Sequence, residues 1–552
     1  MSGRGCGLWL VAMLSGCGAP QGPEIAGGYL CEGAITFTDP GLDAAVREAV
    51  LGVDAPADAE LTYPALIALK GLDVSGRGVM NLEGIECAQG LELLNASDNA
   101  IESLTALAHL PRLTDLDISN QNADALTGLD ALVGLRHLVA RDLGLETVGF
   151  IDEMPALESL DVAQNLIASL EGVSSLSRLE QLNISNNSLD QLSALGVECG
   201  LSILIADGNQ LANIEPLSAC DELYYLSLDD NEVASLHGLE ALDSLRTLRV
   251  DENRIHDLSP LSTLGLEELW IRSNGLEELA PLSSVESLLV LVITNNEVAE
   301  LSPLASAPGL HTFYGRSNQL KSLSGIEFNT ALRLVDVRGN GAITSLAPLS
   351  GLIALRSIGA GGGGAVLDLT PLSGLDAMAA VRLEEVGAGV DLSPLAALPY
   401  LATVSLKGTP LEAAQLSVLA GFGALRDLDV SSAGLTSLDG GVGAPSLKVL
   451  RAASNAITEL PEASAWSGVE DLRLGDNPLT SLSALAGVTS LRRLEAPSTE
   501  IESVASLLEI PGFAGDSFLD VQQTPLDVDD CGDLEALTAR GVDVRADVDC
   551  GR

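Results

Sequence analysis

The sequence predicts an α/β solenoid, a curved horseshoe of about twenty coils with a parallel sheet on its concave side and short 3-10 or irregular segments on its convex side. Three observations lead to this fold class. A group of leucines recurs along most of the 552 residues, an asparagine follows it at a fixed distance in many copies, and aromatic residues make up only 3% of the chain. In such a repeat each coil contacts only its neighbours, so one elongated domain with caps is expected in place of several globular domains.

The repeat is clearest in residues 223–236, which read L-x-x-L-x-L-x-x-N-x-V-x-x-L. Most copies follow one another at 22 residues, and a period of 20–29 residues with this signature is typical of leucine-rich repeats. Twenty copies begin at Leu69, Leu91, Leu113, Leu135, Leu157, Leu179, Leu201, Leu223, Leu245, Leu266, Leu288, Leu310, Leu332, Leu355, Met378, Leu401, Leu425, Leu447, Val469 and Leu491.

Each copy is expected to form a short strand from its x-L-x segment, with the leucines directed into a core shared between coils. The asparagine stands where the chain leaves the strand, so its amide can bond backbone groups that a tight coil leaves unpaired. Twelve copies keep it, and threonine, as at Thr409 and Thr499, can replace part of that bonding. Return segments such as residues 258–261, Leu-Ser-Pro-Leu, predict short turns, because proline fixes φ and lacks an N–H.

The period and this return segment together resemble internalin-type and phosphatase-regulator-type leucine-rich repeats over about four fifths of the chain. The resemblance implies a scaffold and names no ligand. Between residues 345 and 411 the copies are spaced more widely, and four consecutive glycines occupy residues 361–364. We expect a locally irregular segment there.

The N-terminal residues 1–17 have the features of an export signal, with Arg4 followed by a short apolar run. The run ends in Leu-Ser-Gly-Cys, which resembles a bacterial lipobox and implies cleavage before Cys17 and lipidation of its sulfur. This resemblance implies a membrane anchor and an exported, cell-envelope location. Gly18, in place of Asp, gives no cue for retention in the inner membrane, so the outer membrane or cell surface is favoured if the cell has an outer membrane. The alternative is an ordinary secretory signal with an incidental cysteine. Residues 18–30, rich in glycine and proline, are expected to form a flexible tether.

Caps are expected at both ends, because an open solenoid end exposes its core. In the N-terminal cap, residues 31–68, Asp39 can cap a helix that Pro40 begins, with Leu42, Ala45, Val46 and Val50 along one face. This segment resembles the N-terminal cap of exported bacterial proteins with 22-residue repeats. The repeats are assigned to residues 69–512. The C-terminal cap, residues 513–552, is expected to contain a short helix followed by a strand.

Eight cysteines are present, and six remain after Cys6 and Cys17 are assigned to the signal and the lipid anchor. An even number in an exported chain favours disulfides. Their positions suggest the pairs Cys31 with Cys87, Cys199 with Cys220, and Cys531 with Cys550. Metal binding is the alternative, but no C-x-x-C occurs and histidine is scarce, so no metal or other cofactor is expected.

The chain has 77 acidic and 28 basic residues, a formal net charge of −49. This charge opposes binding of nucleic acid by the bulk of the protein. The five histidines are scattered over different coils, and no G-x-S-x-G, H-E-x-x-H or P-loop motif occurs. We therefore expect a protein that is not an enzyme.

Side chains two, four and six places after the first leucine of a copy are expected on the concave face, because strand side chains alternate. In the middle coils these places carry an unusual number of aromatic and arginine residues, the types most enriched in binding hot spots. The candidate ligand-binding residues are Tyr225, Arg249, Trp270, Arg272, Tyr314, Arg316 and Arg338.

Two functions remain open. In the first, an envelope lipoprotein grips a protein or glycan with this concave face, the aromatic rings stacking on the ligand and the arginines meeting carboxylates. In the second, the arginines pair with carboxylates of the chain itself, such as Asp229, Asp251 and Asp336, and the acidic solenoid is a structural spacer without a specific ligand.

Overall fold

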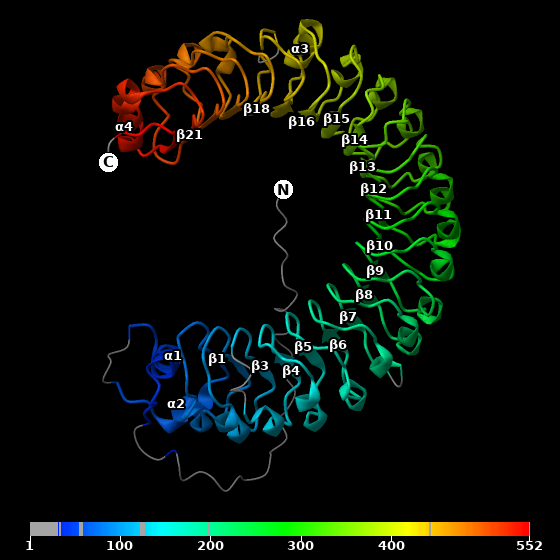
Figure 1. Ribbon diagram of the computed structural model, residues 1–552, viewed down its shortest axis with the longest axis vertical. Helices are drawn as coiled ribbons and strands as arrows, with labels where there is room; N and C mark the ends of the chain where they lie inside the picture. Colours follow the sequence, from blue (N-terminus) through cyan, green and yellow to red (C-terminus); the bar gives the residue numbers. More distant parts are fainter. Residues whose placement is uncertain are drawn as a thin grey trace. The chain divides into compact units, whose positions relative to one another are not determined.

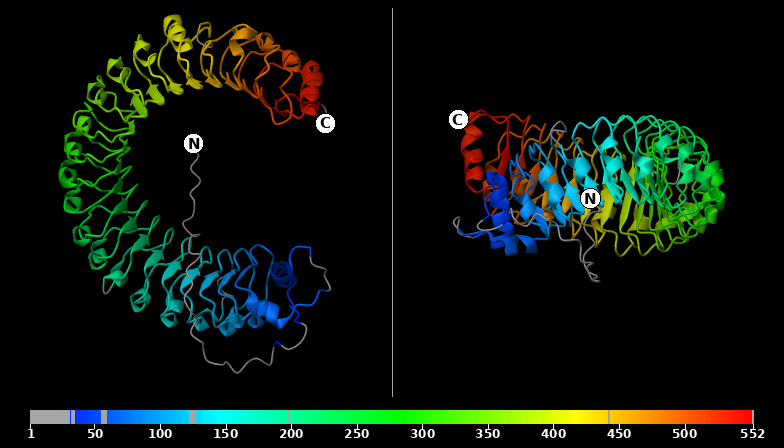
Figure 2. Two further views of the ribbon diagram at one scale, coloured as in Figure 1. Left: turned by 180° about the vertical axis from the view of Figure 1, so that it is seen from behind. Right: turned by 90° about the horizontal axis from the view of Figure 1, so that it is seen from below.

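The computed structural model describes residue 31 and residues 35–54, 59–121, 127–196, 199–440 and 443–550. The expected signal peptide, Cys17 and the tether lie outside the described residues. The described residues fall into two compact units: those up to residue 117 together with 127–132, and residues 118–121 together with those from 133 onward. The strands and 3-10 helices of the second unit follow one another along an arc, with the strands on its inner side (Figures 1 and 2).

The structure confirms the predicted fold class, a curved solenoid with parallel strands. Strands β1–β20 each begin two residues after the first residue of one of the twenty predicted copies. The strands are β1 (Gly71–Asp73), β2 (Leu93–Asn95), β3 (Asp115–Asp117), β4 (His137–Val139), β5 (Ser159–Asp161), β6 (Gln181–Asn183), β7 (Ile203–Ile205), β8 (Tyr225–Ser227), β9 (Thr247–Arg249), β10 (Glu268–Trp270), β11 (Val290–Val292), β12 (Thr312–Tyr314), β13 (Leu334–Asp336), β14 (Ser357–Gly361), β15 (Ala380–Glu384), β16 (Thr403–Ser405), β17 (Asp427–Asp429), β18 (Val449–Arg451), β19 (Asp471–Arg473), β20 (Arg493–Glu495), β21 (Phe518–Asp520) and β22 (Asp543–Arg545).

Successive strands pair in parallel within each unit, and equivalent positions of neighbouring coils stand side by side. Tyr225 of β8 pairs with Thr247 of β9, and Thr247 with Glu268 of β10. In strands β1–β13 and β16–β21 the middle residue is buried in the core, as Leu226 and Leu248 are without any exposure. The first and last residues therefore share the opposite, concave face.

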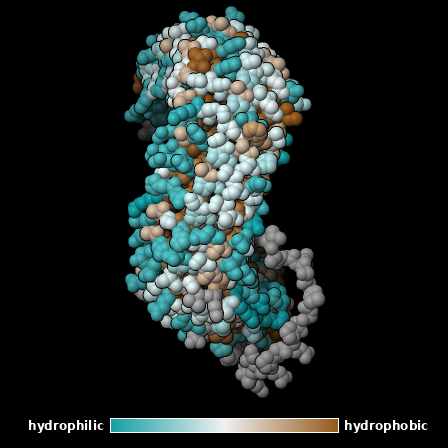
Figure 3. All heavy atoms as spheres, turned by 90° about the vertical axis from the view of Figure 1, so that its right-hand side faces the viewer, coloured by the Kyte–Doolittle hydropathy of each residue, from teal (hydrophilic) through white to brown (hydrophobic). Residues whose placement is uncertain are grey.

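Most return segments are single turns of 3-10 helix, as the proline-containing segments predict. They are η1 (Ile85–Cys87), η2 (Thr105–His109), η4 (Leu129–Ala131), η5 (Gly149–Glu153), η6 (Val173–Ser175), η7 (Ser193–Leu195), η8 (Glu215–Ala219), η9 (Leu239–Ala241), η10 (Ser259–Leu261), η11 (Ala280–Ser284), η12 (Ser302–Ser306), η13 (Ile326–Phe328), η14 (Ala347–Leu349), η15 (Thr370–Leu372), η16 (Ser393–Leu395), η17 (Ala463–Trp466), η18 (Ser483–Leu485), η19 (Ala505–Glu509) and η20 (Val528–Asp530). One return segment is instead the α-helix α3 (Ala413–Ala420). The outer surface of the middle coils is mainly hydrophilic to neutral, with scattered hydrophobic residues (Figure 3).

The asparagine of the repeat bonds the backbone of two coils. The Nδ2 of Asn231 donates to the carbonyls of Ala206, Leu228 and Asp229 at 3.0, 3.1 and 3.2 Å, and its Oδ1 accepts the N–H of Leu211 at 3.0 Å. All twelve asparagines donate to at least two carbonyls and accept a backbone N–H of the preceding coil. The predicted role of this residue is confirmed.

Threonine makes part of the same bonding where it replaces asparagine. The Oγ1 of Thr409 donates to the carbonyl of Leu383 at 3.1 Å and accepts the N–H of Val386 at 3.2 Å. Both contacts lie in the buried interior, where an unpaired backbone group would destabilise the fold. The prediction for threonine is thus confirmed at this position.

The local irregularity expected between residues 345 and 411 does not interrupt the sheet, although Gly361, Gly362 and Gly364 have positive φ. The strands here are the longest of the described sheet, and Ser357–Gly361 pairs with Ala380–Glu384 over five residues. Gly362 has φ +98°, and a Cβ on it would lie 2.6 Å from the Cα of Gly339 in the preceding coil. The glycines therefore allow neighbouring coils to approach closely instead of interrupting the repeat.

The described N-terminal segment contains the helices α1 (Pro40–Leu51) and α2 (Tyr63–Ala68), of which only α1 was expected. Asp39 caps α1, as predicted: its Oδ1 accepts the N–H of Gly41 at 2.9 Å, and its Oδ2 accepts that of Met80 at 2.8 Å. Burial opposes ionisation of this carboxyl, but the backbone donors outweigh it and lower its pKa. Leu42 and Val46 of α1 are fully buried.

Beyond the last predicted copy, the ladder continues through β21 and β22. The helix α4 (Cys531–Ala539) lies between these two strands and packs against η19 and β22. A helix followed by a strand is therefore present in the segment expected to form the C-terminal cap.

Candidate functional site

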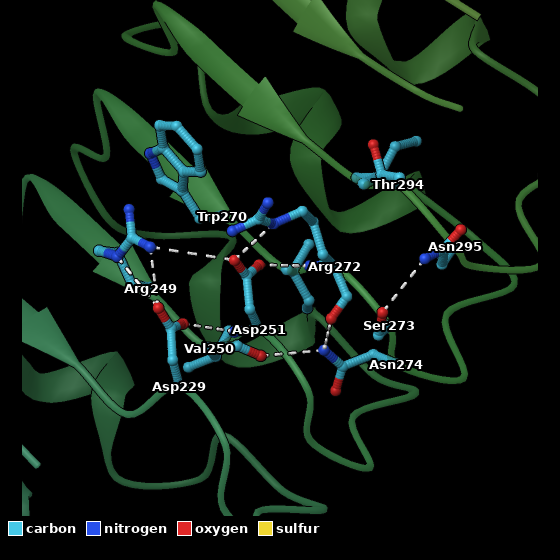
Figure 4. Close-up of polar contacts among 12 residues, drawn as sticks. Asp229, Arg249, Val250, Asp251, Trp270, Arg272, Ser273, Asn274, Thr294 and Asn295 are labelled. Carbon is cyan, nitrogen blue, oxygen red and sulfur yellow. Dashed lines mark hydrogen bonds and ion pairs between the residues drawn. The ribbon is translucent and has the colours of Figure 1, made fainter. Parts of the chain in front are cut away.

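The Trp270 cluster comprises Tyr225, Arg249, Trp270 and Arg272 with the carboxylate partners of the two arginines, and it lies on the concave side of β8–β10. Figure 4 shows Arg249, Trp270 and Arg272 with Asp229 and Asp251. Tyr225 begins β8, Arg249 ends β9 and Trp270 ends β10, so rigid paired strands position all three side chains. Arg272 stands two residues beyond Trp270, where the chain leaves the strand.

Two carboxylates hold the arginines of the cluster. The Nε and Nη2 of Arg249 donate to Oδ2 of Asp229 at 3.1 and 2.9 Å, and its Nη2 also lies 4.0 Å from Oδ2 of Asp251. The Nε of Arg272 donates to Oδ2 of Asp251 at 2.7 Å. The side chain of Asp251 is only 5% exposed. In the Arg272–Asp251 pair the carboxylate is therefore buried, while the side chain of Arg272 extends into solvent.

The indole ring of Trp270 contacts both guanidinium groups. The Cζ of Arg249 lies 4.7 Å from the ring centroid and that of Arg272 lies 5.8 Å from it. Figure 4 shows the ring above the two arginines. Such cation–π contacts add to the ion pairs and restrict the rotamers of all three side chains.

Three aspartates form a column beneath the cluster, at the position six residues after the first leucine. The Oδ1 of Asp207 accepts the N–H of Asp229 at 2.9 Å, that of Asp229 accepts the N–H of Asp251 at 2.7 Å, and that of Asp251 accepts the N–H of Arg272 at 2.5 Å. Each carboxylate thus ties its coil to the next one. The other oxygens of Asp229 and Asp251 bind arginines, and no ion pair to Asp207 is found within the described residues.

Burial and neighbouring charges shift the pKa values in this column. Burial raises the pKa of Asp207, despite the hydroxyl of Ser227 donating to it at 2.6 Å. Burial likewise raises the pKa of Asp251, against the hydrogen bonds from Arg272. The pKa of the Tyr225 hydroxyl is raised by burial and by the surrounding carboxylates.

The guanidinium of Arg249 is half-buried, and burial favours its neutral form. The charge and the hydrogen bonds of Asp229 outweigh this effect and raise the pKa of Arg249 above its ordinary value. Arg249 is therefore held as a cation whose charge is balanced by the carboxylate of Asp229.

Arg316 and Arg338 form a separate Asp336 cluster. The Nη2 of Arg316 donates to Oδ2 of Asp336 at 2.5 Å, and Arg338 binds the same carboxylate through Nε at 3.0 Å and Nη2 at 2.9 Å. Arg338 also pairs with Glu384, two coils away. Gly361 occupies the intervening position in β14 and has no side chain to block this reach. Burial opposes ionisation of Asp336, but the two arginines outweigh it and lower its pKa.

The residues predicted to form one concave patch therefore fall into two clusters, the Trp270 cluster and the Asp336 cluster. Tyr314, the last residue of β12, is half-buried, and its hydroxyl has no hydrogen-bond partner among the described residues. Sequence reasoning missed Asp207 and Glu384, although both stand at concave positions of their copies. It also missed the concave arginines of the last coils, because the candidate set was confined to the middle coils.

Three disulfides join Cys31 to Cys87, Cys199 to Cys220, and Cys531 to Cys550. The predicted disulfides are confirmed in these pairs, and the metal alternative for the cysteines is wrong. In the described part of the chain, no group of three or more His, Cys, Asp or Glu side chains could hold a metal ion. Disulfides persist in oxidising compartments, so the protein is suited to an environment outside the reducing cytosol.

The described helices are all too short or too polar to cross a bilayer.

The parallel ladder, the bonded asparagines and the 3-10 return segments define a leucine-rich repeat solenoid. A sequence family described as leucine-rich repeats (2 copies) matches residues 134–196. A comparison with curated proteins found no match.

Solved structures share this fold. A TDR receptor aligns with a TM-score of 0.55 at 18% identity, covering 88% of this chain and 90% of the receptor. The plant peptide hormone receptor RGFR1, in complex with RGF2, aligns with a TM-score of 0.52 at 17% identity, covering 88% and 91%. An internalin, InlF from Listeria monocytogenes, aligns with a TM-score of 0.45 at 22% identity, covering 67% and 95%.

Proposed function

We propose that this chain is a non-catalytic lipoprotein of the bacterial cell envelope that binds a ligand with the concave face around Trp270. The observation that carries the proposal is the Trp270 cluster itself: an indole with a guanidinium from Arg249 and from Arg272, each anchored by an aspartate. Tryptophan, tyrosine and arginine are the side chains that most often dominate binding energy.

Preorganisation is the physical advantage of this arrangement. A side chain that is already fixed before binding loses less conformational entropy when a ligand covers it. The ion pairs and the ring contacts fix Arg249 and Trp270, which lie on paired strands, and Arg272, which follows β10 and keeps an exposed side chain. The ring edge and the free N–H groups of Arg272 suit a ligand that combines an apolar group with a carboxylate or carbonyl oxygen.

A protein ligand fits better than a glycan. The plant receptor RGFR1, whose solenoid has the same fold, is seen in complex with RGF2. At 17% identity this likeness concerns the fold, and it supports only the idea that a solenoid of this kind can present a long face to a polypeptide. A glycan remains the second class of ligand, because tryptophan and tyrosine also stack on sugars.

The envelope location rests on the sequence of the N-terminus and on the disulfides. Leu-Ser-Gly-Cys at residues 14–17 has the form of a lipobox, so Cys17 is assigned as the lipidated residue. Three disulfides agree with export to an oxidising compartment. A lipid on Cys17 would tether the solenoid to a membrane through residues 18–30.

A structural spacer is the second candidate function, and a specific observation favours it. All four candidate arginines pair with carboxylates of the chain: Arg249 with Asp229, Arg272 with Asp251, and Arg316 and Arg338 with Asp336. If these pairs serve only the stability of the solenoid, no ligand is needed to explain them.

Affinity capture from envelope extract separates the two functions. The purified protein is compared with a Tyr225→Ala, Trp270→Ala double variant and with Tyr400→Ala, which removes a tyrosine that is 68% exposed and lies outside the cluster. We expect a partner that the wild type and Tyr400→Ala retain and the double variant loses. Equal capture by all three, or no capture, would favour the spacer.

A further inference from the structure

A second arginine group lies on the concave side of the last coils, outside the Trp270 and Asp336 clusters. Strands β19–β22 pair in register, placing Asp471, Arg493, Phe518 and Asp543 side by side. The middle residues of β19–β21 are buried leucines, so the flanking side chains share the opposite face. The C-terminal cluster is defined here as Arg473, Arg493, Glu495, Phe518 and Arg545.

The ring of Phe518 contacts two guanidinium groups from neighbouring strands. The Cζ of Arg493 in β20 lies 4.1 Å from the ring centroid, and that of Arg545 in β22 lies 5.0 Å from it. This repeats the arrangement at Trp270, where one ring also contacts two arginines. Contact with a ring face restricts a guanidinium and leaves its N–H edge available for hydrogen bonds.

The carboxylates of the C-terminal cluster are shared by only two of its arginines. Arg473 pairs with Asp471 at 2.9 Å and with Glu495 at 3.7 Å. Arg493 pairs with Glu495 at 2.5 Å. Glu495 thus serves two cations.

Arg545 differs from every arginine of the Trp270 cluster. Arg545 is exposed. Across the described part of the chain, no carboxylate lies within ion-pair distance of its guanidinium, which instead contacts the ring of Phe518. The neighbour of Arg545 in the strand register, Asp520, accepts the backbone N–H of Gln522 at 3.1 Å. The cluster therefore contains a positioned guanidinium without a counter-ion in a chain whose net charge is −49.

We propose that Arg545, held against Phe518, receives a carboxylate of a polypeptide bound along the concave face of the last coils. A planar guanidinium fork matches a carboxylate through two parallel hydrogen bonds. The strongly acidic chain repels polyanions such as nucleic acids, whereas a polypeptide segment with a single carboxylate is repelled far less. This inference deepens the proposed binding function but uses different residues, so each can fail alone.

Selection from a displayed library of random linear peptides tests the proposal. The full chain is the bait, and the best peptide is then titrated against the wild type, Arg545→Gln and Arg426→Gln. Arg426 is the matched control: it too is exposed and has no ion pair among the described residues, but it lies outside the cluster. Trp270→Ala is the fourth protein, and it reports on the proposed function separately.

We expect the selected peptides to be enriched in carboxylates, and their binding to weaken at least about tenfold in Arg545→Gln while Arg426→Gln binds like the wild type. Replacing peptide glutamates or aspartates with their amides, or amidating the peptide C-terminus, identifies which carboxylate is bound. Weakening in Trp270→Ala alone would place the peptide at the Trp270 cluster and overturn this proposal. Equal binding by wild type and Arg545→Gln, no carboxylate enrichment, or no selected binder would also overturn it.

Discussion

The asparagine of the repeat links neighbouring coils through its side-chain amide. Asn231 bonds three carbonyls and one N–H, and its side chain is almost fully buried. Removing the amide leaves these backbone groups without a partner in the interior. Buried groups in that state each destabilise a protein by about 1–3 kcal/mol, although the effects do not add fully.

The first prediction concerns Asn231→Ala, which should lower the free energy of unfolding by about 2–4 kcal/mol. The control is Asn213→Ala, which removes an exposed side chain whose Oδ1 accepts a single backbone N–H, from Glu215. Urea unfolding followed by circular dichroism measures both. A loss in Asn231→Ala no larger than that in the control would contradict the assigned role.

A second prediction concerns Asp207, whose pKa is raised by burial. A carboxyl with a raised pKa in the folded state contributes stability at low pH, and this contribution is lost as the pH rises through the folded-state pKa. Asp207→Asn does not ionise and avoids this loss. The free energy of unfolding of the variant, relative to the wild type, should therefore increase between about pH 3 and about pH 7.

Asp257 is the control for that prediction, because the hydroxyl and N–H of Ser259 lower its pKa. The sign reverses, so Asp257→Asn should lose stability relative to the wild type as the pH rises. Urea unfolding at both pH values measures the two differences. If the free energy of unfolding relative to the wild type changed in the same direction with pH in both variants, burial of Asp207 would not control its ionisation.

At the scale of the element, the glycine segment shows how neighbouring coils fit together. Gly362 has φ +98°, and its position faces the backbone of Gly339. Gly362→Ala should destabilise the protein by about 2–4 kcal/mol, since the added methyl group clashes with backbone and the left-handed region disfavours alanine. Gly374→Ala is the control, because a Cβ there meets nothing within 4 Å and its φ is ordinary.

Thermal unfolding of both glycine variants measures this effect. The control should unfold within a few degrees of the wild type, because exposed substitutions usually change stability by less than about 0.5 kcal/mol. Indistinguishable midpoints for the two variants would mean that the coils around Gly362 can move apart without loss, and that the close approach is not required.

The strands could be predicted from sequence because every copy repeats the apolar residues, mostly leucines, that fill the core, and most copies repeat the asparagine at the turn after the strand. β1–β20 begin at one fixed position of each copy. The glycine segment could not, because four glycines in a row are typical of loops, and their role depends on Gly339 and Gly341 in the preceding coil. A single copy does not contain that information.

The candidate residues were predictable as concave, and Asp229, Asp251 and Asp336 as carboxylates that could pair with the arginines, but which arginine binds which carboxylate was not. Arg249 binds Asp229 of the preceding coil more closely than Asp251, and Arg338 reaches past Gly361 to Glu384. Such choices depend on rotamers and on the distance between coils, which the repeat pattern does not specify. Arg545 was missed because β21 and β22 follow the last copy that matches the leucine pattern.

At the scale of the whole molecule, the net charge of −49 should make stability depend on salt. Self-repulsion among carboxylates destabilises a folded chain, and salt screens it. Raising NaCl from about 0.01 M to about 0.15 M shortens the Debye length from about 30 Å to about 8 Å. The thermal midpoint at neutral pH should therefore rise, and calorimetry at the two salt concentrations measures it.

The same salt increase at about pH 4 supplies the control, because many carboxylates are then protonated and the net charge is smaller. The rise in the thermal midpoint should shrink. A rise of the same size at both pH values would indicate a general effect of salt on the solvent and would exclude charge repulsion as its cause.

Binding of a polypeptide by the Trp270 cluster is tested most directly by the affinity of the captured partner. Its dissociation constant is measured by calorimetric titration against the wild type and against Trp270→Ala, with circular dichroism to show that the solenoid remains folded. We predict a Kd at least about tenfold higher for Trp270→Ala, because a positioned tryptophan between two arginines is a hot spot. Equal Kd values for the two proteins would contradict the claim and leave the acidic spacer as the better account.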